Sequence, residues 1–388
     1  MPKNKPLKIL FLCSWYPNRT NKTLGNFIQK HAEAISKIHQ VDTLCLVSDP
    51  NCESVECIVK KNNNVREIIV YYPSSKNTLP IINNLSKIRR QFTAFKIGWK
   101  KVIEDKKPDL THLNVIYPIG LWAMYLKKRK NIPYIITEHS SGFQNEKNAY
   151  SKKILSFSKK VLSKAEYIIP VSEDLKSHLQ KVHPGNNYRC ISNVVNKNIF
   201  NPGISNTPKK QFIHVSTAYE PAKNILGIVK TIKALSLKRK DFNLQIISDG
   251  DTLAAHELAR ELGILNSFVV FHDTKTTEEI AKMYHGKEAL ILFSNFENFP
   301  CVIPEAWMSG IPVIATSVNG IPEYVNSSNG ILIEPKDQKA LENAMNSILD
   351  NNKTFDPEKL RSYAIDHFSY EAIAEQYNSI YQKIKFQH

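Results

Sequence analysis

Short apolar runs alternate along the chain with segments whose apolar residues recur at helical spacing. The apolar runs are residues 8–13, 41–48, 65–72, 108–114, 133–137, 167–171, 212–216, 244–248, 268–271, 289–293 and 311–315. The segments with helical spacing are 27–38, 80–103, 117–128, 225–237, 277–284 and 370–381. Apolar runs of this length, separated by helices, are typical of buried parallel strands. The pattern therefore predicts an α/β protein with doubly wound sheets.

One stretch interrupts this alternation. Residues 196–210 are rich in Asn, Pro, Gly and Lys and have no periodicity, which is typical of a linker. The 388 residues are enough for two domains, each with its own core. We therefore expect Rossmann-like domains at 1–200 and 201–367.

Charge divides the chain at the same place. Residues 1–200 carry 33 Lys and Arg against 14 Asp and Glu, whereas residues 201–388 carry 19 against 22. A basic half of this kind fits an anionic membrane surface, although an ordinary solvated basic surface explains it too. Nucleic acid is not expected as a partner, because no helix-turn-helix pattern, RNA-binding aromatic run or zinc spacing is visible.

Two further features indicate a cytoplasmic protein. No run of about 18 apolar residues is present, so no transmembrane helix is expected. The six cysteines are scattered without metal-ligand spacing and are expected to be reduced thiols. The expected location is the cytoplasm, with peripheral attachment to the inner face of the cell membrane as an option. No metal or other cofactor is expected.

The chemistry concentrates in residues 294–320, between two predicted strands. Glu297 lies in the loop after the first strand, and Glu305 lies eight positions later, in the first turns of a short helix that ends at Gly310. Ligands of open parallel sheets bind outside the carboxyl ends of the strands. The helix start beside Glu297 offers N–H groups and a positive dipole end that suit a diphosphate.

This stretch resembles the Glu-x7-Glu motif of the family 4 retaining glycosyltransferases, which have the two-domain GT-B fold. The resemblance continues through Gly310-Ile-Pro-Val-Ile-Ala-Thr, Asn319-Gly-Ile-Pro-Glu and Asn329-Gly-Ile-Leu-Ile-Glu. It implies that Glu297 contacts the donor sugar and that Glu305 binds the ribose of its nucleotide. It also implies that a C-terminal helix, residues 368–388, packs back on the first domain.

Weaker matches in other loops extend the resemblance to almost the whole chain. Thr137-Glu-His139 implies that His139 lies beside the transferred sugar, and Lys223-Asn224 implies a lysine on the donor diphosphate. Trp15-Tyr-Pro-Asn with Gly25-Asn26-Phe implies that Gly25 and Asn26 lie near the phosphates and the acceptor. The remaining implied donor-binding residues are Asn224, Asn298, Phe299, Cys301 and Val302.

Two departures from the family pattern concern the donor site. Pro300 stands in the family's Glu-Gly-Phe-Gly run and has no N–H to donate. Ser216-Thr217 stands where the family often has an arginine, so half of the usual cationic pair is missing.

The resemblance implies a retaining, metal-independent transfer of a hexose-type sugar. The donor would be a nucleotide-diphosphate sugar and the acceptor a lipid-linked or polysaccharide molecule, as in surface polysaccharide biosynthesis. Lys223 and helix-end N–H groups would meet the charge of the leaving diphosphate. No double-displacement nucleophile is evident, which favours front-face transfer. The alternatives are another GT-B activity, such as a sugar-nucleotide epimerase or a phosphorylase, and a non-catalytic nucleotide-sugar binder.

Overall fold

The computed structural model describes residues 5–74, 80–144, 149–204 and 210–385. The chain forms two compact units, one of residues 1–192 with 370–388 and one of residues 193–369. The division thus falls after Ser192 rather than after residue 200, and the return begins at Tyr370 rather than at residue 368. The predicted linker is described over 196–204, where no helix or strand is present, and at Lys210, which already belongs to a strand. Residues 386–388 of the predicted last helix lie outside the described residues.

The N-terminal unit is built on a seven-stranded sheet with the order β3-β4-β2-β1-β5-β6-β7, counted over the described residues. Its strands are β1 (Lys8–Cys13), β2 (Gln40–Asp49), β3 (Glu56–Asn62), β4 (Val65–Pro73), β5 (Leu110–Asn114), β6 (Tyr134–Glu138) and β7 (Ile168–Pro170). Every neighbouring pair is parallel except β3 and β4. All six residues of β1 are buried, as expected for a central strand covered on both faces.

Strand β3 was missed by the sequence analysis. It lies at the sheet edge, and all seven of its residues are exposed or half-buried, so its short apolar stretch Cys57-Ile58-Val59 did not stand out as a buried strand. It pairs with β4 as an antiparallel hairpin, and Asn63 in the turn has a positive φ of 52°. Asn tolerates this conformation better than most residues do, so the run Asn62-Asn63-Asn64 was the available signal.

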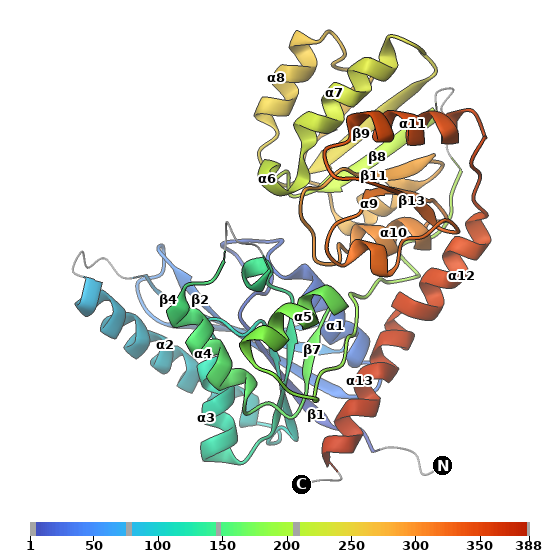
Figure 1. The fold of residues 1–388 in the computed structure, drawn as a ribbon. Helices are drawn as coiled ribbons and strands as arrows, with labels where there is room; N and C mark the ends of the chain where they lie inside the picture. The colour runs from blue at the N-terminus through green and yellow to red at the C-terminus, as the bar shows by residue number, and fades with distance from the viewer. Residues whose placement is uncertain (1–4, 75–79, 145–148, 205–209, 386–388) are drawn as a thin grey trace. The chain divides into compact units, whose positions relative to one another are not determined.

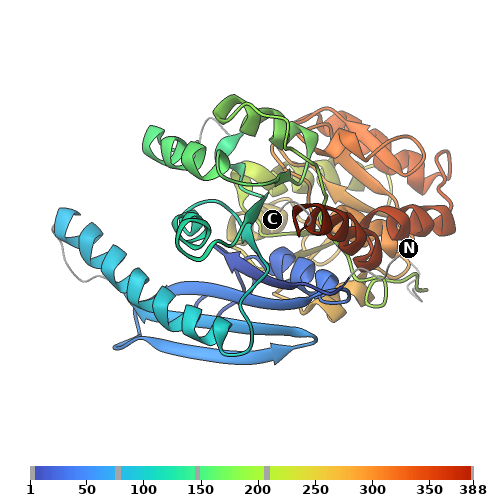
Figure 2. The ribbon, with the colours of Figure 1, turned by 90° about the horizontal axis from the view of Figure 1, so that it is seen from below.

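Helices cover both faces of the N-terminal sheet (Figure 1). They are α1 (Asn26–Ile35), α2 (Pro80–Ile103), α3 (Gly120–Lys130), α4 (Lys152–Leu162), α5 (Glu173–Val182) and α13 (Tyr370–Lys385). Helix α13 packs beside α1, as Figure 2 shows from below. Ser172 caps α5 by accepting a hydrogen bond from Leu175 N.

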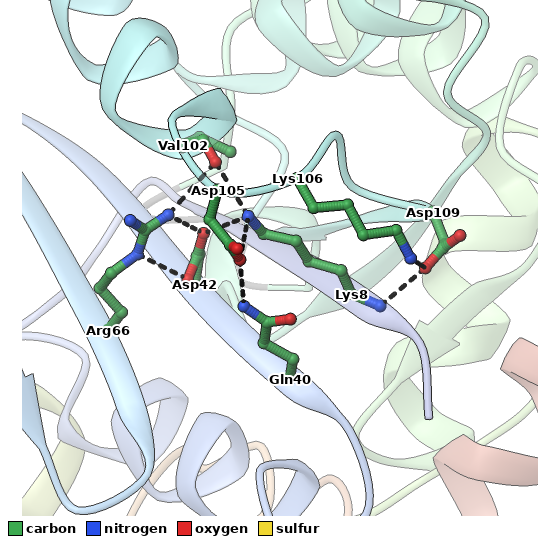
Figure 3. A network of polar contacts seen from close by, with 8 residues as sticks. All are labelled: Lys8, Gln40, Asp42, Arg66, Val102, Asp105, Lys106 and Asp109. Carbon is green, nitrogen blue, oxygen red and sulfur yellow. Dashed lines mark hydrogen bonds and ion pairs between the residues drawn. The ribbon is translucent and has the colours of Figure 1, made fainter. Parts of the chain in front are cut away.

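A buried ionic network closes the amino ends of β1, β2 and β4 (Figure 3). Lys8 Nζ lies 3.3 Å from Asp42 Oδ2, and both side chains are only 1% exposed. The guanidinium of Arg66 binds both oxygens of Asp42, and Lys8 Nζ also donates to Val102 O at 3.0 Å. Asp105, at the end of α2, takes part through a second contact to Lys8. Every charge of this network is therefore met by another group of the chain.

The C-terminal unit has a fully parallel sheet with the order β10-β9-β8-β11-β12-β13 over the described residues. Its strands are β8 (Lys210–Ser216), β9 (Phe242–Ser248), β10 (Val269–His272), β11 (Ala289–Leu292), β12 (Val313–Thr316) and β13 (Gly330–Ile333). Neighbouring residues of β8 face opposite cores, with Phe212 in one and Ile213 in the other. The architecture of both units is thus the predicted doubly wound α/β class.

The helices of the C-terminal unit are α6 (Glu220–Lys223), α7 (Ile225–Ser236), α8 (Leu253–Glu261), α9 (Thr277–Tyr284), α10 (Val302–Met308), α11 (Gln338–Leu349) and α12 (Pro357–Phe368). Sequence periodicity did not reveal α8, α11 or α12, nor α4 in the first unit. Helix α8 buries only Ala255 and Ala259, so its apolar stripe is weak. The segment that contains Glu323 is a single 3₁₀ turn, Ile321–Glu323.

Candidate functional site

The carboxyl ends of β8, β11 and β12 are neighbours in the C-terminal sheet, and each leads into a loop that carries a candidate residue. Helix α6 follows β8 and ends at Lys223, and Glu297 follows β11. Lys223 Nζ donates to Glu297 Oε1 at 2.5 Å. Asn319, after β12, accepts from Glu297 N through Oδ1 at 3.3 Å. Two residues that lie 74 positions apart in sequence therefore form one ion pair at this edge.

Further hydrogen bonds hold the Glu297 loop in place. Ser294 Oγ donates to Glu297 Oε1 at 2.9 Å, and Thr316 Oγ1 donates to Ser294 O at 2.6 Å. Asn295 N donates to Ala222 O at 2.7 Å, which ties the loop to α6. The Lys223 side chain is 17% exposed and that of Glu297 is 7% exposed. The pair is thus pre-positioned and desolvated but still reaches the surface.

Asn224 joins α6 to α7 with a left-handed backbone, at a φ of 52°. The carboxylate of Glu220 accepts from Ile225 N at 2.7 Å and from Leu226 N at 3.2 Å. Glu220 therefore occupies the amino end of α7, whose first N–H groups are already bonded. The sequence analysis missed this cap, because Glu220 lies in the preceding helix α6, five positions before Ile225.

Glu305 is the fourth residue of α10 and is largely buried, as its place in the first turns predicted. Cys301 is the cap residue of this helix, and Val302 is its first residue. Pro304 lies in the first turn, where a missing N–H breaks no helical bond. Gly310, with a φ of 76°, ends the helix as predicted.

The backbone carbonyl oxygens of Asn298 and Phe299 accept hydrogen bonds from other residues of the C-terminal unit. Gly320 N donates to Asn298 O, and Asn193 Nδ2 donates to Phe299 O at 2.7 Å. The Phe299 ring is buried and packs 4.4 Å from the ring of Tyr324, between centroids. The Phe299 side chain therefore belongs to the core, and its assignment to the donor site stays a prediction.

His214 is a buried group at this edge that the sequence analysis overlooked. Burial lowers the pKa of its imidazole to about 4, so the ring is neutral. Its Nδ1 lies 2.8 Å from Ile291 O and its Nε2 lies 2.8 Å from Ser216 Oγ. His214 thus orients Ser216, the uncharged residue found where the resemblance leads one to expect arginine. Its position inside a β strand made it look like a core residue.

In the N-terminal unit, Gly25 precedes α1 with a φ of 69°. A Cβ atom at this position would lie 2.7 Å from the carbonyl carbon of Trp15, so only glycine fits. Asn26 is the first residue of α1 and is exposed. Phe27, the next residue, packs on His139 with ring centroids 4.4 Å apart. The two N-terminal motifs therefore meet within this unit.

His139 follows directly after β6 and is nearly buried. Burial, with His31 and His112 nearby, holds the pKa of its imidazole well below the ordinary value. The neighbouring carboxylate of Glu138 accepts from the N–H groups of His139, Ser140 and Ile116. Burial raises the pKa of Glu138 to about 7 against the effect of these bonds. The imidazole is thus neutral and can exchange hydrogen bonds without carrying charge.

Two broader features complete the description. Within the described residues, no three His, Cys, Asp or Glu side chains are grouped so that they could hold a metal ion. The same residues include no helix that is long and apolar enough to cross a membrane.

The chain matches known sequence families over most of its length. Residues 25–198 match the family model described as Glycosyltransferase Family 4, and residues 196–367 match that described as Glycosyl transferases group 1. An uncharacterized glycosyltransferase of Methanocaldococcus jannaschii is 28% identical over 312 residues, which are 77% of this chain and 84% of that protein. A D-inositol 3-phosphate glycosyltransferase of Corynebacterium diphtheriae is 33% identical over 129 residues, but these span only 32% of this chain and 30% of that protein.

Solved structures share the architecture at low sequence identity. Sucrose-phosphate synthase from Thermosynechococcus elongatus superposes with a TM-score of 0.78 at 20% identity, over 98% of this chain and 100% of that one. The Anabaena protein HepE in complex with UDP-glucose gives a TM-score of 0.72 at 16% identity, over 97% and 100%. The two family matches and this shared GT-B fold show that the chain belongs to the family 4 glycosyltransferases.

Proposed function

We propose that this glycosyltransferase moves a hexose-type sugar from a nucleotide-diphosphate donor to a lipid-linked or polysaccharide acceptor, with retained configuration and without a metal ion. The observation that carries the proposal is the Lys223–Glu297 pair at the carboxyl edge of the C-terminal sheet. Ligands of such sheets bind at this edge. The pair combines a cation for a diphosphate with an acceptor for sugar hydroxyl groups.

Donor binding would separate the two partners. The diphosphate attracts the Lys223 ammonium, which then stabilises the negative charge that develops as the glycosidic bond breaks. Glu297 becomes free to accept from the donor sugar, while Ser294 keeps its carboxylate in place. Glu305 would accept from the ribose hydroxyl groups. Asn224, Asn298, Cys301 and Val302 complete the proposed donor site.

The proposed roles of the N-terminal residues follow the resemblance. His139 would bind the transferred sugar as a neutral imidazole, through hydrogen bonds that need no proton transfer. Gly25 and Asn26 would lie near the phosphates and the acceptor. No residue is assigned as a covalent nucleophile, so the proposal includes front-face transfer with the diphosphate as leaving group.

The test is thermal stabilisation by UDP-, GDP- and ADP-sugars, followed by product analysis with lipid-linked and glycan acceptors. UDP-glucose comes first, because HepE shares the fold and was solved with it. At a ligand concentration of 100 times Kd, binding adds about 2.7 kcal/mol to the free energy of unfolding. We expect one nucleotide series to stabilise the wild type and Glu305→Ala to remove most of that effect.

The other outcomes identify the rival functions. A changed sugar nucleotide without any acceptor would indicate an epimerase, and dependence on inorganic phosphate would indicate a phosphorylase. Binding without turnover on every acceptor would indicate a non-catalytic binder. No stabilisation by any nucleotide sugar would contradict the proposed donor site.

A basic groove in the N-terminal unit supports an anionic membrane surface as a partner. This groove of about 530 Å³ is lined by Trp99, Ile103, Asn131 and four cations, which are Lys107, Lys128, Arg129 and Lys130. Among the described residues these four cations have no ion pair, whereas the adjacent Lys106 and Lys127 are paired with Asp109 and Glu166. Unneutralised cations beside an indole and an exposed isoleucine suit the headgroup region of an anionic bilayer.

The membrane proposal is tested by sedimentation with vesicles of neutral lipid alone and with added anionic lipid, at low and high salt. Replacing the four groove cations by Ser should weaken binding to anionic vesicles more than tenfold. The matched control replaces Lys152, Lys153, Lys159 and Lys160 of α4, which removes the same charge elsewhere in the unit. Equal losses in both variants, or no binding by the wild type, would contradict a specific docking groove.

A further inference from the structure

Two tyrosines of the last helix enter a buried hydrogen-bond network at the strand ends of the N-terminal unit. Tyr381 Oη lies 2.7 Å from His112 Nδ1, and His112 Nε2 lies 2.6 Å from Thr137 Oγ1. Thr137 Oγ1 lies 3.0 Å from Tyr377 Oη. All four side chains are buried. The network therefore connects α13 to the middle of β5 and to the end of β6.

The hydrogen bonds of this network can all point the same way along it. Burial holds the pKa of His112 well below its ordinary value, so the ring is neutral, with one nitrogen that donates and one that accepts. Proton donation can therefore run from Tyr381 through His112 and Thr137 to Tyr377, or the reverse. In either case each bond is satisfied, and such connected networks rigidify the groups that they join.

This network ends two residues before His139. Thr137 and His139 are separated only by Glu138, whose carboxylate holds His139 N and Ser140 N. The His139 ring lies between Phe27 and His31, with centroid distances of 4.4 and 5.6 Å. His31 itself contacts the Tyr377 ring, edge to face, at 5.8 Å. Tyr377 therefore reaches His139 along two routes, through the Thr137 backbone and through the His31 ring.

We propose that Tyr377 and Tyr381 are positioning residues for sugar transfer, because their hydroxyl groups join α13 to His112 and Thr137 and so fix the strand end that carries His139. The inference rests on the proposed role of His139. Phenylalanine would fill the same space in a buried helix face without needing polar partners. The two hydroxyl groups are thus explained by their bonds to His112 and Thr137, since a buried polar group without its partner is costly.

The first experiment compares Tyr381→Phe with Tyr370→Phe. Tyr370 lies on the same helix, and its hydroxyl donates to Glu33 Oε2 at 2.8 Å, away from the network. Both variants lose one oxygen atom and one hydrogen bond. We expect Tyr381→Phe to lower kcat roughly fivefold to tenfold with the donor KM unchanged, and Tyr370→Phe to leave kcat within about twofold. Equal kcat values for the two variants would overturn the inference.

The second experiment is a double-mutant cycle with His139→Ala. If Tyr381 acts through His139, Tyr381→Phe should lower kcat no further when His139 is already absent. A merely structural effect would instead multiply with the effect of His139→Ala, and that result would also overturn the inference. An inactive wild type, or full activity of His139→Ala, would contradict the proposed function or the role of His139, which separates that failure from the failure of the positioning role.

Discussion

Two lysine–carboxylate pairs of this protein have the same chemistry but differ in burial, in position and in the number of their partners. Lys8 and Asp42 lie at the amino ends of the N-terminal strands, where Arg66, Val102 and Asp105 supply further partners (Figure 3). Lys223 and Glu297 lie at the carboxyl ends of the C-terminal strands, and among the described residues Glu297 is the one recorded acceptor for Lys223 Nζ. The first pair is saturated by the chain itself, whereas in the proposed function the second exchanges a partner for a ligand.

The comparison shows that burial of an ion pair alone does not indicate function. The edge of the sheet and the number of partners distinguish a structural pair from a candidate binding pair.

The largest expected difference is in stability. Asp42→Ala removes the buried carboxylate that Lys8 and Arg66 share and leaves Lys8 with the half-exposed Asp105, so it should cost about 3–5 kcal/mol of the free energy of unfolding in urea. The control is Asp241→Ala, which removes an exposed partner of Arg239 and should cost less than about 1 kcal/mol. Similar costs for both variants would contradict a structural role for the Lys8–Asp42 pair.

The next effect is on activity. Lys223→Met should lower kcat/KM by about 10²–10³, because the leaving diphosphate loses a positioned cation. Its free energy of unfolding should fall by less than that of Asp42→Ala, because Lys223 is 17% exposed and Glu297 keeps its bond from Ser294. Lys230→Met, on the exposed face of α7, makes the same chemical change and should retain normal activity. A loss of stability like that of Asp42→Ala would place Lys223 with the structural pair.

Backbone strain at the carboxyl edge gives a smaller effect. Gly25→Ala would bring a Cβ atom 2.7 Å from the Trp15 backbone at a φ of 69° and should cost roughly 1–3 kcal/mol. Gly263→Ala, at a φ of 66° with no neighbouring atom within 4 Å, carries the strain without the clash. Thermal unfolding of both variants separates the two contributions, and equal losses would show that the Trp15 contact is unimportant.

The last effect depends on pH and concerns Glu138, a buried carboxylate held by N–H groups at this edge. Its pKa is raised to about 7, so between about pH 4.5 and 7 the folded state keeps a proton that the unfolded state has lost. The unfolding free energy contributed by Glu138 therefore falls as pH rises, by about 1.4 kcal/mol per pH unit.

Urea unfolding of the wild type and Glu138→Gln at several pH values isolates this contribution, because the buried histidines are present in both proteins. The stability of the variant relative to the wild type should rise from pH 4.5 to 7 and stay constant above pH 7. A relative stability that does not vary with pH would contradict the raised pKa.

Much of the fold followed from local pattern. The buried strands were predicted from apolar runs, and Gly310 was correctly predicted to end α10. Among the missed elements, β3 and α8 bury few residues, so their sequences give a weak signal, whereas α11 buries six residues and its apolar spacing was overlooked. The resemblance brought the candidate residues to notice, but it could not show that the Phe299 ring is part of the core or that Glu220 already occupies the amino end of α7.

By itself the sequence determined the α/β class, the order of most buried strands and the candidate site residues, because these depend on short-range periodicity and on motif spacing. Only the tertiary structure decided which charges meet. Lys223 and Glu297 pair across 74 positions, and Tyr381 reaches His112 across 269. Such contacts arise because parallel strands bring their carboxyl ends to one edge and α13 packs against the N-terminal unit, and no local pattern in the chain encodes that proximity.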